Sequence, residues 1–242
     1  MQAAGCPICR LERKAARKYV EVFLYENLMD HSLQDQAVRA YGFCPPHTRF
    51  FAAMEQSSSG PPLGVNILYE RLNRRVSQEL THVLARNAPA AWFHGILSRL
   101  GLRLPAPPKP KVLQPAAACP ICESAAQSAL NTLSALFEEI ERDTDDIMTS
   151  YRQSDGLCLA HLRLGLEHYS YAHTKAARFL SDWATQRLEK QAGWMKEFIR
   201  KKNWEYRSEP LTPDEAAAWQ HALAFYTGYP ADAFTPDLDD FQ

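Results

Sequence analysis

The feature that most constrains this chain is a duplicated pattern of cysteine and histidine residues. The motif C-P-I-C at residues 6–9 returns unchanged at residues 119–122. A second motif, G-x-C-x-x-H, covers residues 42–47 and returns at residues 156–161. The offsets are 113 and 114 residues, and the two copies together use all six cysteines. An internal duplication of this kind sets the architecture of the whole chain.

The residues of the duplicated pattern are candidate metal ligands. Structural zinc takes four tetrahedral ligands, and three cysteines with one histidine are among its usual sets. A spacer of two residues allows both side chains of a pair to reach one ion. The pattern therefore predicts two structural zinc ions, with the ligands Cys6, Cys9, Cys44, His47, Cys119, Cys122, Cys158 and His161. Because four protein ligands leave no position for water, we predict no catalytic residues.

These ligands can be paired in two ways. The favoured pairing closes each site within its own half, because the 34 or 35 residues between the motifs can form a helix out and a shorter helix back. One site then combines residues 6–9 with 44–47, and the other combines 119–122 with 158–161. The alternative exchanges partners between the halves, so that Cys6 and Cys9 join Cys158 and His161.

The rest of the sequence predicts an all-α fold, because apolar residues recur near a 3.6-residue period and runs of alternating β-branched residues are absent. A C-terminal helix is signalled by the capping residues Thr212 and Glu215 with Pro213 at the first helical position, and Gly228 ends it. The other predicted helices cover residues 10–30, 33–41, 65–86, 123–142, 146–153 and 162–204, the last one broken near His173.

A proline-rich segment at residues 105–115 separates the two copies of the pattern. Closely spaced prolines exclude helix and central strand and favour a stiff, extended linker. We therefore expect two homologous zinc-bound helical units. The first covers residues 1–104, and the second covers residues 116–242 and includes the C-terminal helix.

Composition excludes several classes of protein. The 242 residues carry a formal net charge of -1 and are 46% hydrophobic, which indicates a globular chain without global attraction to nucleic acid or acidic membranes. No apolar stretch approaches the ~18 residues of a membrane span, and the N-terminus does not resemble a signal peptide. We expect a cytoplasmic protein without membrane association, in which reduced cysteines serve as ligands rather than disulfides.

Two alternative functions remain open. A C-P-I-C motif at a helix start is also the layout of thiol redox enzymes and sensors, although the βαβ framework of those enzymes is not predicted here. Nucleic-acid binding is the other, since zinc modules with basic helices often bind nucleic acid. The first predicted helix carries a basic patch, interrupted by Glu12, that consists of Arg10, Arg13, Lys14, Arg17 and Lys18.

Five segments of the chain together match the pattern of a known family. They are C-P-x-C at 6–9 with Leu11-Glu12-Arg13, G-F-C-P-x-H at 42–47, the cysteine pair at 119–122, the Cys-His pair at 158–161, and the stretch from Glu209-Pro210 through Trp219 to Ala222. On these residues the chain resembles a bacterial family catalogued only as a domain of unknown function. Residues 159–160 depart from the family pattern, which has a proline in that spacer. The resemblance supports the metal sites and the repeat, and it implies no reaction.

The sequence as a whole favours a non-catalytic binding or adaptor protein whose helical faces are positioned by metal. Another protein is the expected partner, and nucleic acid is a less favoured one. The sequence defines neither the oligomeric state nor the identity of the partner.

Overall fold

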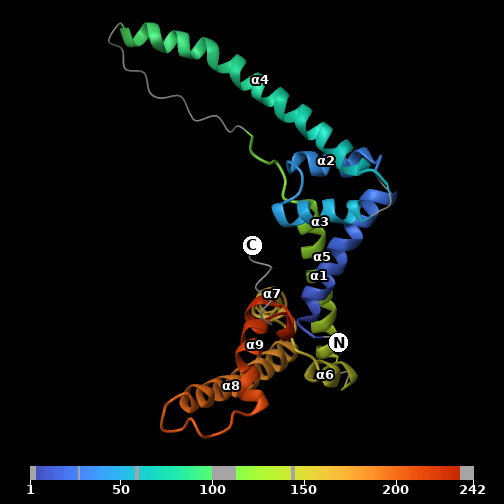
Figure 1. The fold of residues 1–242 in the computed structure, drawn as a ribbon. Helices are drawn as coiled ribbons and strands as arrows, with labels where there is room; N and C mark the ends of the chain where they lie inside the picture. The colour runs from blue at the N-terminus through green and yellow to red at the C-terminus, as the bar shows by residue number, and fades with distance from the viewer. Residues whose placement is uncertain (1–3, 27, 58–59, 100–112, 143–144, 235–242) are drawn as a thin grey trace. The chain divides into compact units, whose positions relative to one another are not determined.

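The structure, a computed structural model, describes residues 4–26, 28–57, 60–99, 113–142 and 145–234, with the backbone alone for 83–99 and 145. All regular secondary structure in these ranges is helical (Figure 1), which confirms the all-α prediction. Within the same ranges, no helix combines the length and the apolar character that crossing a bilayer requires.

The helices follow the predicted order with some changes of boundary. The break near His173 is confirmed, since this residue caps the start of α8, and the C-terminal helix has its predicted capping box and its left-handed Gly228. The α-helices are α1 Pro7–Glu21, α2 His31–Arg39, α3 Pro45–Gln56, α4 Leu63–Arg99, α5 Pro120–Glu141, α6 Asp145–Arg152, α7 Leu159–Tyr169, α8 Thr174–Lys201 and α9 Pro213–Thr227. A π-helical turn, Val22–Glu26, follows α1, and a 3-10 turn, Ala231–Phe234, follows α9.

One helix was not predicted from the sequence. Helix α3 begins directly after Cys44, with prolines at its first two positions. Proline is favoured at these positions because the first amides of a helix have no intrahelical acceptor. Pro45 and Pro46 could therefore have predicted the start of α3 from the sequence. Helix α4 also continues beyond the predicted end at residue 86, to Arg99.

The chain forms two compact units that do not follow the repeat. Unit 1 combines Met1–Ala15 with Ala125–Gln242, and unit 2 is the continuous segment Ala16–Ser124. The expected units were residues 1–104 and 116–242. Most of the linker expected at 105–115 lies outside the described residues, which resume at residue 113.

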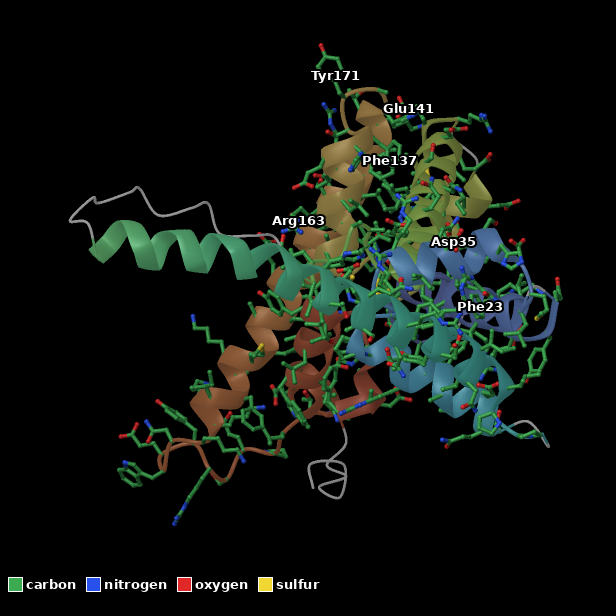
Figure 2. The ribbon with its side chains drawn as sticks, turned by 90° about the horizontal axis from the view of Figure 1, so that it is seen from above. Phe23, Asp35, Phe137, Glu141, Arg163 and Tyr171 are labelled. Atoms are coloured by element: carbon green, nitrogen blue, oxygen red, sulfur yellow. The ribbon has the colours of Figure 1, made fainter. Side chains whose placement is uncertain are left out.

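The core of unit 1 lies among α5, α6, α7 and α8. Phe137 of α5 is fully buried there, and its ring centroid lies 5.6 Å from that of Tyr169 on α7. The amide of Ala176, in the first turn of α8, donates a hydrogen bond of 3.0 Å to the carboxylate of Glu141. Tyr171, in the turn between α7 and α8, points into solvent (Figure 2).

The core of unit 2 is built around three phenylalanine rings. These rings belong to Phe23 in the π-helical turn, Phe43 just before α3, and Phe51 in α3. Their ring centroids lie 5.0–5.9 Å apart. Leu68 and Leu72 of α4 pack against these rings. The cluster thus buries aromatic residues on both sides of the Cys-His motif at residues 44–47.

Candidate metal centres

The eight candidate ligands lie in two groups of four. Site A consists of Cys6, Cys9, Cys158 and His161, all within unit 1. Site B consists of Cys44, His47, Cys119 and Cys122, all within unit 2. In each group the four ligand atoms lie within 4.8 Å of one another, so each group could hold a metal ion.

All four motif copies share one local structure at the start of a helix. In each copy a cysteine stands directly before the first helical residue, and the second ligand follows three residues later. The first cysteines are Cys6 before α1, Cys119 before α5, Cys44 before α3 and Cys158 before α7. The carbonyl oxygen of each accepts a hydrogen bond of 2.8–3.2 Å from the amide four residues on. Each pair therefore lies at a helix N-terminus, where backbone N–H groups favour thiolate.

A glycine forms the turn that precedes each C-x-x-H motif. Gly42 and Gly156 have φ values of +90° and +71°, the left-handed region that glycine adopts without strain. At Gly156 a Cβ atom would also lie 2.4 Å from the ring of Trp183. The turn expected at these two positions is thus present in both copies.

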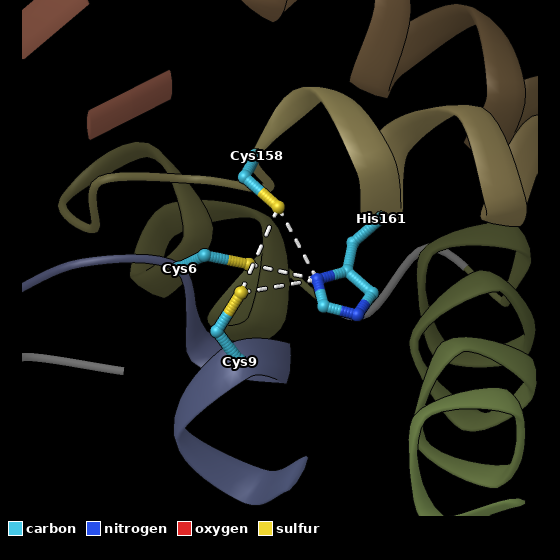
Figure 3. A group of neighbouring side chains, drawn as sticks. All are labelled: Cys6, Cys9, Cys158 and His161. Carbon is cyan, nitrogen blue, oxygen red and sulfur yellow. Dashed lines mark hydrogen bonds between the residues drawn. The ribbon is translucent and has the colours of Figure 1, made fainter. Parts of the chain in front are cut away.

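The four side chains of site A surround a common centre (Figure 3). The Nδ1 atom of His161 lies 3.2 Å from Sγ of Cys158, 3.3 Å from Sγ of Cys9 and 3.6 Å from Sγ of Cys6. The sulfurs of Cys9 and Cys158 are 3.7 Å apart. Cys6 and Cys158 are each 3% exposed, so this centre is part of the core of unit 1.

Site B repeats this geometry in a more open setting. The Nδ1 atom of His47 lies 3.2 Å from Sγ of Cys44, 3.3 Å from Sγ of Cys122 and 3.6 Å from Sγ of Cys119. The sulfurs of Cys44 and Cys122 are 3.6 Å apart. Cys122 is exposed, and the other three ligands are partly exposed.

Each group of four combines the C-P-I-C motif of one half of the sequence with the C-x-x-H motif of the other half. The prediction that each site closes within its own half is therefore wrong, and the alternative pairing is the one present. The isoleucine inside each C-P-I-C motif gives the physical reason. Ile8 is 1% exposed and packs in the core that contains Leu157 and Cys158. Ile121 is fully buried in the core that contains Phe43. Apolar packing therefore places each C-P-I-C motif beside the C-x-x-H motif of the other half.

Site A is supported by a carboxylate. Oε2 of Glu12, one turn after Cys9 on α1, lies 3.2 Å from Nε2 of His161. A histidine that ligates through one ring nitrogen is commonly oriented by a carboxylate at the other, which fixes its tautomer. The position equivalent to Glu12 in the second C-P-I-C copy is Ala125, which has no acceptor side chain. In the described part of the chain, Nε2 of His47 has no hydrogen-bond partner.

The end of helix α9 covers site A. Gly228, buried and at φ +77°, lies so close that a Cβ atom would stand 2.3 Å from Sγ of Cys9 and 3.3 Å from Sγ of Cys158. On another side, the amide of Gly5 donates a hydrogen bond of 2.6 Å to Asp155, whose carboxylate also pairs with Arg187 at 3.1 Å. The segment before Cys6 is thereby fixed to the turn before Cys158.

The pKa shifts at site A indicate that a positive charge at its centre would be stabilised. Burial lowers the pKa of His161, but hydrogen bonds with Cys158, Cys6 and Glu12 outweigh burial and raise the pKa to about 11. Hydrogen bonds with Cys158 and Cys9 hold the pKa of Cys6 below its ordinary value, and those with Cys158 and Cys6 hold the pKa of Cys9 above its ordinary value. A metal cation would supply the charge that protons otherwise supply, and binding would release those protons.

Site B shows the opposite shift at its histidine. Burial lowers the pKa of His47. Burial also raises the pKa of Cys119, but backbone hydrogen bonds, first from Cys44, outweigh it and bring the pKa below its ordinary value. Burial and the neighbouring Cys44 raise the pKa of Cys122 to about 12. The pKa values of the two histidines shift in opposite directions because hydrogen bonds with Cys158, Cys6 and Glu12 outweigh burial at His161, whereas burial dominates at His47.

The basic residues proposed for nucleic acid lie along α1 with different surroundings. Nη1 of Arg10 donates to the carbonyl oxygens of Ala4 and Gly5, at 2.9 Å and 2.6 Å. The guanidinium of Arg13 lies 5.7 Å from the ring centroid of Tyr229. Lys14, Arg17 and Lys18 are exposed, with Lys18 3.4 Å from Glu26.

Two residues at site A, Glu12 and Gly228, were not predicted from the sequence as parts of a site. The position of Glu12 in the sequence could have predicted its role, because a carboxylate one helical turn after a ligand is well placed to support another ligand. Gly228 was predicted to end α9, and no pattern in the sequence placed that end beside Cys9.

The fold and the two groups define an all-helical protein with paired Cys3His clusters that could hold metal ions. The chain belongs to the family of unknown function DUF6062, whose model matches residues 1–232, and this confirms the resemblance seen in the sequence. It is also similar to an uncharacterized 23.9 kDa protein in the xynA 3' region of Caldicellulosiruptor sp. (strain Rt8B.4). The two are 28% identical over 225 residues, which cover 92% of this chain and 95% of that protein. No solved structure matches the chain.

Proposed function

We propose that sites A and B each bind one structural zinc ion, and the distances between ligand atoms carry this proposal. Zinc bonds of about 2.3 Å to sulfur and about 2.0 Å to nitrogen, at tetrahedral angles, separate two sulfurs by about 3.8 Å and sulfur from nitrogen by about 3.5 Å. One sulfur pair in each site, Cys9–Cys158 and Cys44–Cys122, lies at 3.7 and 3.6 Å. The six sulfur–nitrogen pairs lie at 3.2–3.6 Å. Both groups support tetrahedral coordination, with thiolate as the main ligand type.

A zinc ion held this way stabilises the fold and performs no reaction. Four protein ligands fill a tetrahedral shell, whereas catalytic zinc keeps one position for water or substrate. Apparent binding energies of about 10–16 kcal/mol for structural zinc are part of the folding energy. Each ion would tie two helix N-termini together: α1 with α7 at site A, and α3 with α5 at site B.

We propose further that the chain is a non-catalytic binding or adaptor protein whose partner is another protein. Exposed apolar side chains support this role. Trp219, Leu223 and Tyr226 lie at helical spacing on α9 and are 43%, 39% and 62% exposed. Apolar residues gathered on one face are typical of surfaces that contact other proteins.

Elemental analysis of untagged protein tests the zinc proposal. We expect two zinc ions per chain and thiols that are alkylated more slowly before a chelator is added than after it. A chain without metal and with freely reactive thiols would contradict it. The adaptor role is tested by capture of partners with native protein and with a variant that has serine at residues 219, 223 and 226. Equal recovery of every captured protein would contradict a role for α9.

Nucleic-acid binding remains the second candidate, supported by the exposed side chains of Lys14 and Arg17 on α1. A gel-shift titration at several salt concentrations tests it, because phosphate contacts make affinity strongly salt-dependent. Substitution of both residues with glutamate should then abolish binding.

A further inference from the structure

Site B includes one exposed cysteine. Cys122, the second ligand of α5, is exposed, whereas Cys6 and Cys158 of site A are each 3% exposed. Cys9, the third cysteine of site A, is partly exposed and lies against Gly228, where an added Cβ atom would stand 2.3 Å from its sulfur. A dissolved oxidant should therefore reach site B at Cys122 more readily than site A, where two of the three cysteines are buried and Cys9 is only partly exposed.

The sulfur of Cys122 is chemically competent and has a partner beside it. A thiol that ligates a metal is deprotonated, and the thiolate is the nucleophilic form of cysteine. The sulfur of Cys44 is 3.6 Å away, so a modest movement brings the two to the bonding distance of about 2.05 Å.

We propose that Cys122 is a redox modification site, where a hydroperoxide oxidises it, Cys44 closes a disulfide with it, and site B loses its metal while site A keeps its own. This inference rests on the proposed function, since it requires metal at both sites. It assigns distinct roles to two clusters with the same ligand set.

The chemistry takes two balanced steps. The Cys122 thiolate attacks the distal oxygen of the hydroperoxide, the O–O bond breaks, and one proton is taken up, which leaves a sulfenic acid and releases an alcohol, or water from hydrogen peroxide. The Cys44 thiolate then attacks the sulfenic sulfur, and water leaves after uptake of a second proton. The hydroperoxide is reduced by two electrons and the cysteine pair is oxidised by two. His47 and Cys119 alone remain as ligands, too few for a structural zinc site.

Hydrogen peroxide added to the two-zinc protein, with a chromogenic zinc chelator present, tests the proposal. We expect one equivalent of zinc to be released and peptide mapping to find a Cys44–Cys122 disulfide, with the other four cysteines reduced. Release of both ions together, a disulfide at Cys6, Cys9 or Cys158, or a disulfide of Cys122 with Cys119 would each overturn it. If no zinc is found before peroxide is added, the proposed function itself fails and this inference fails with it.

Three variants make the test specific. Cys122→His keeps four ligands at site B but removes the reactive sulfur, so peroxide-driven release should slow by about tenfold or more. Gly193→Ala, at a position in α8 where an added Cβ atom meets nothing within 4 Å, is the control and should leave the release rate unchanged. In Cys44→His, the sulfenic acid on Cys122 has lost its partner and should be trapped by dimedone. Release at the native rate from Cys122→His would overturn the proposal.

Discussion

Sites A and B have the same ligands, the same spacing and the same helix N-termini, yet their surroundings differ. Site A lies in the core of unit 1, with Glu12 at its histidine and Gly228 against its sulfurs. Site B has an exposed cysteine and, in place of Glu12, an alanine at residue 125. The two sites share the ligand geometry that a tetrahedral ion requires, and they differ in the surroundings that would determine how firmly an ion is held.

The largest expected difference comes from removal of one ligand at equivalent positions. Cys158→Ser and Cys44→Ser each replace the capping cysteine with a residue that still caps a helix, so the loss is that of the metal ligand. Because Cys158 lies in the core of unit 1, we expect its replacement to lower the melting temperature by about 10 °C or more. Cys44→Ser should cost less than half as much, by thermal denaturation at fixed zinc concentration. Equal losses would contradict the comparison.

The carboxylate at site A is the next difference to test. Glu12→Gln keeps the shape of the side chain but removes the charge beside His161. Zinc affinity at site A should fall by about 10–100-fold, the usual effect of losing such a partner, while affinity at site B stays the same. Competition with a chelator of known affinity measures both constants. An unchanged site A would show that Glu12 does not support its histidine.

The order in which metal is lost gives a third test. With a chelator in excess, zinc should leave in two phases, and the phase from exposed site B should be about tenfold faster or more, because burial and outer contacts hold the other ion. Cys44→Ser should remove the fast phase and Cys158→Ser the slow one. A single phase from the native protein would mean that the two surroundings are equivalent in effect.

A glycine pair tests the cover over site A. Gly228→Ala places a Cβ atom against Cys9 and Cys158 in a left-handed conformation, which costs about 1–2 kcal/mol from strain alone. Site A should bind zinc more weakly, and site B should not change. Gly193→Ala is the matched control, since a Cβ atom there meets nothing within 4 Å inside helix α8. This control should be neutral or stabilise the protein by about 0.5–1 kcal/mol in urea denaturation. Equal effects of the two substitutions would contradict the cover.

The smallest effect concerns the start of α9, far along the helix from Gly228. Hydrogen bonds from Lys201, at 2.7 and 2.9 Å, hold the pKa of Glu215 below its usual value. Its carboxylate therefore stabilises the fold above the unfolded pKa of about 4.3, and this contribution is lost as pH falls through the folded value. Glu215→Gln should be less stable than the native protein at pH 7, with a difference that shrinks in acid. Asp214→Asn, also in the first turn, is the control and should show a smaller difference.

The sequence alone was enough for the all-helical class, the eight candidate ligands and the capping of α9, because each depends on local pattern. It could not decide the pairing of the ligands. Cys9 reaches Cys158, 149 residues away, rather than Cys44, 35 residues away. The entropy of closing the longer loop exceeds that of the shorter one by only about 1.3 kcal/mol, so separation along the chain decides little. Buried Ile8 and Ile121 contribute more, and their packing partners are not written in the local sequence.

The crossed pairing also sets the order in which the protein can be completed during synthesis. The ligands of site B are all present once residue 122 has left the ribosome, whereas Cys6 and Cys9 wait for residues 158 and 161. At about 5–20 residues per second, synthesis from residue 9 to residue 161 lasts roughly 8–30 seconds. During this time the first two thiols of the nascent chain have no native partners and depend on a reducing environment. Metal at site A can then be acquired only late, after both halves have met.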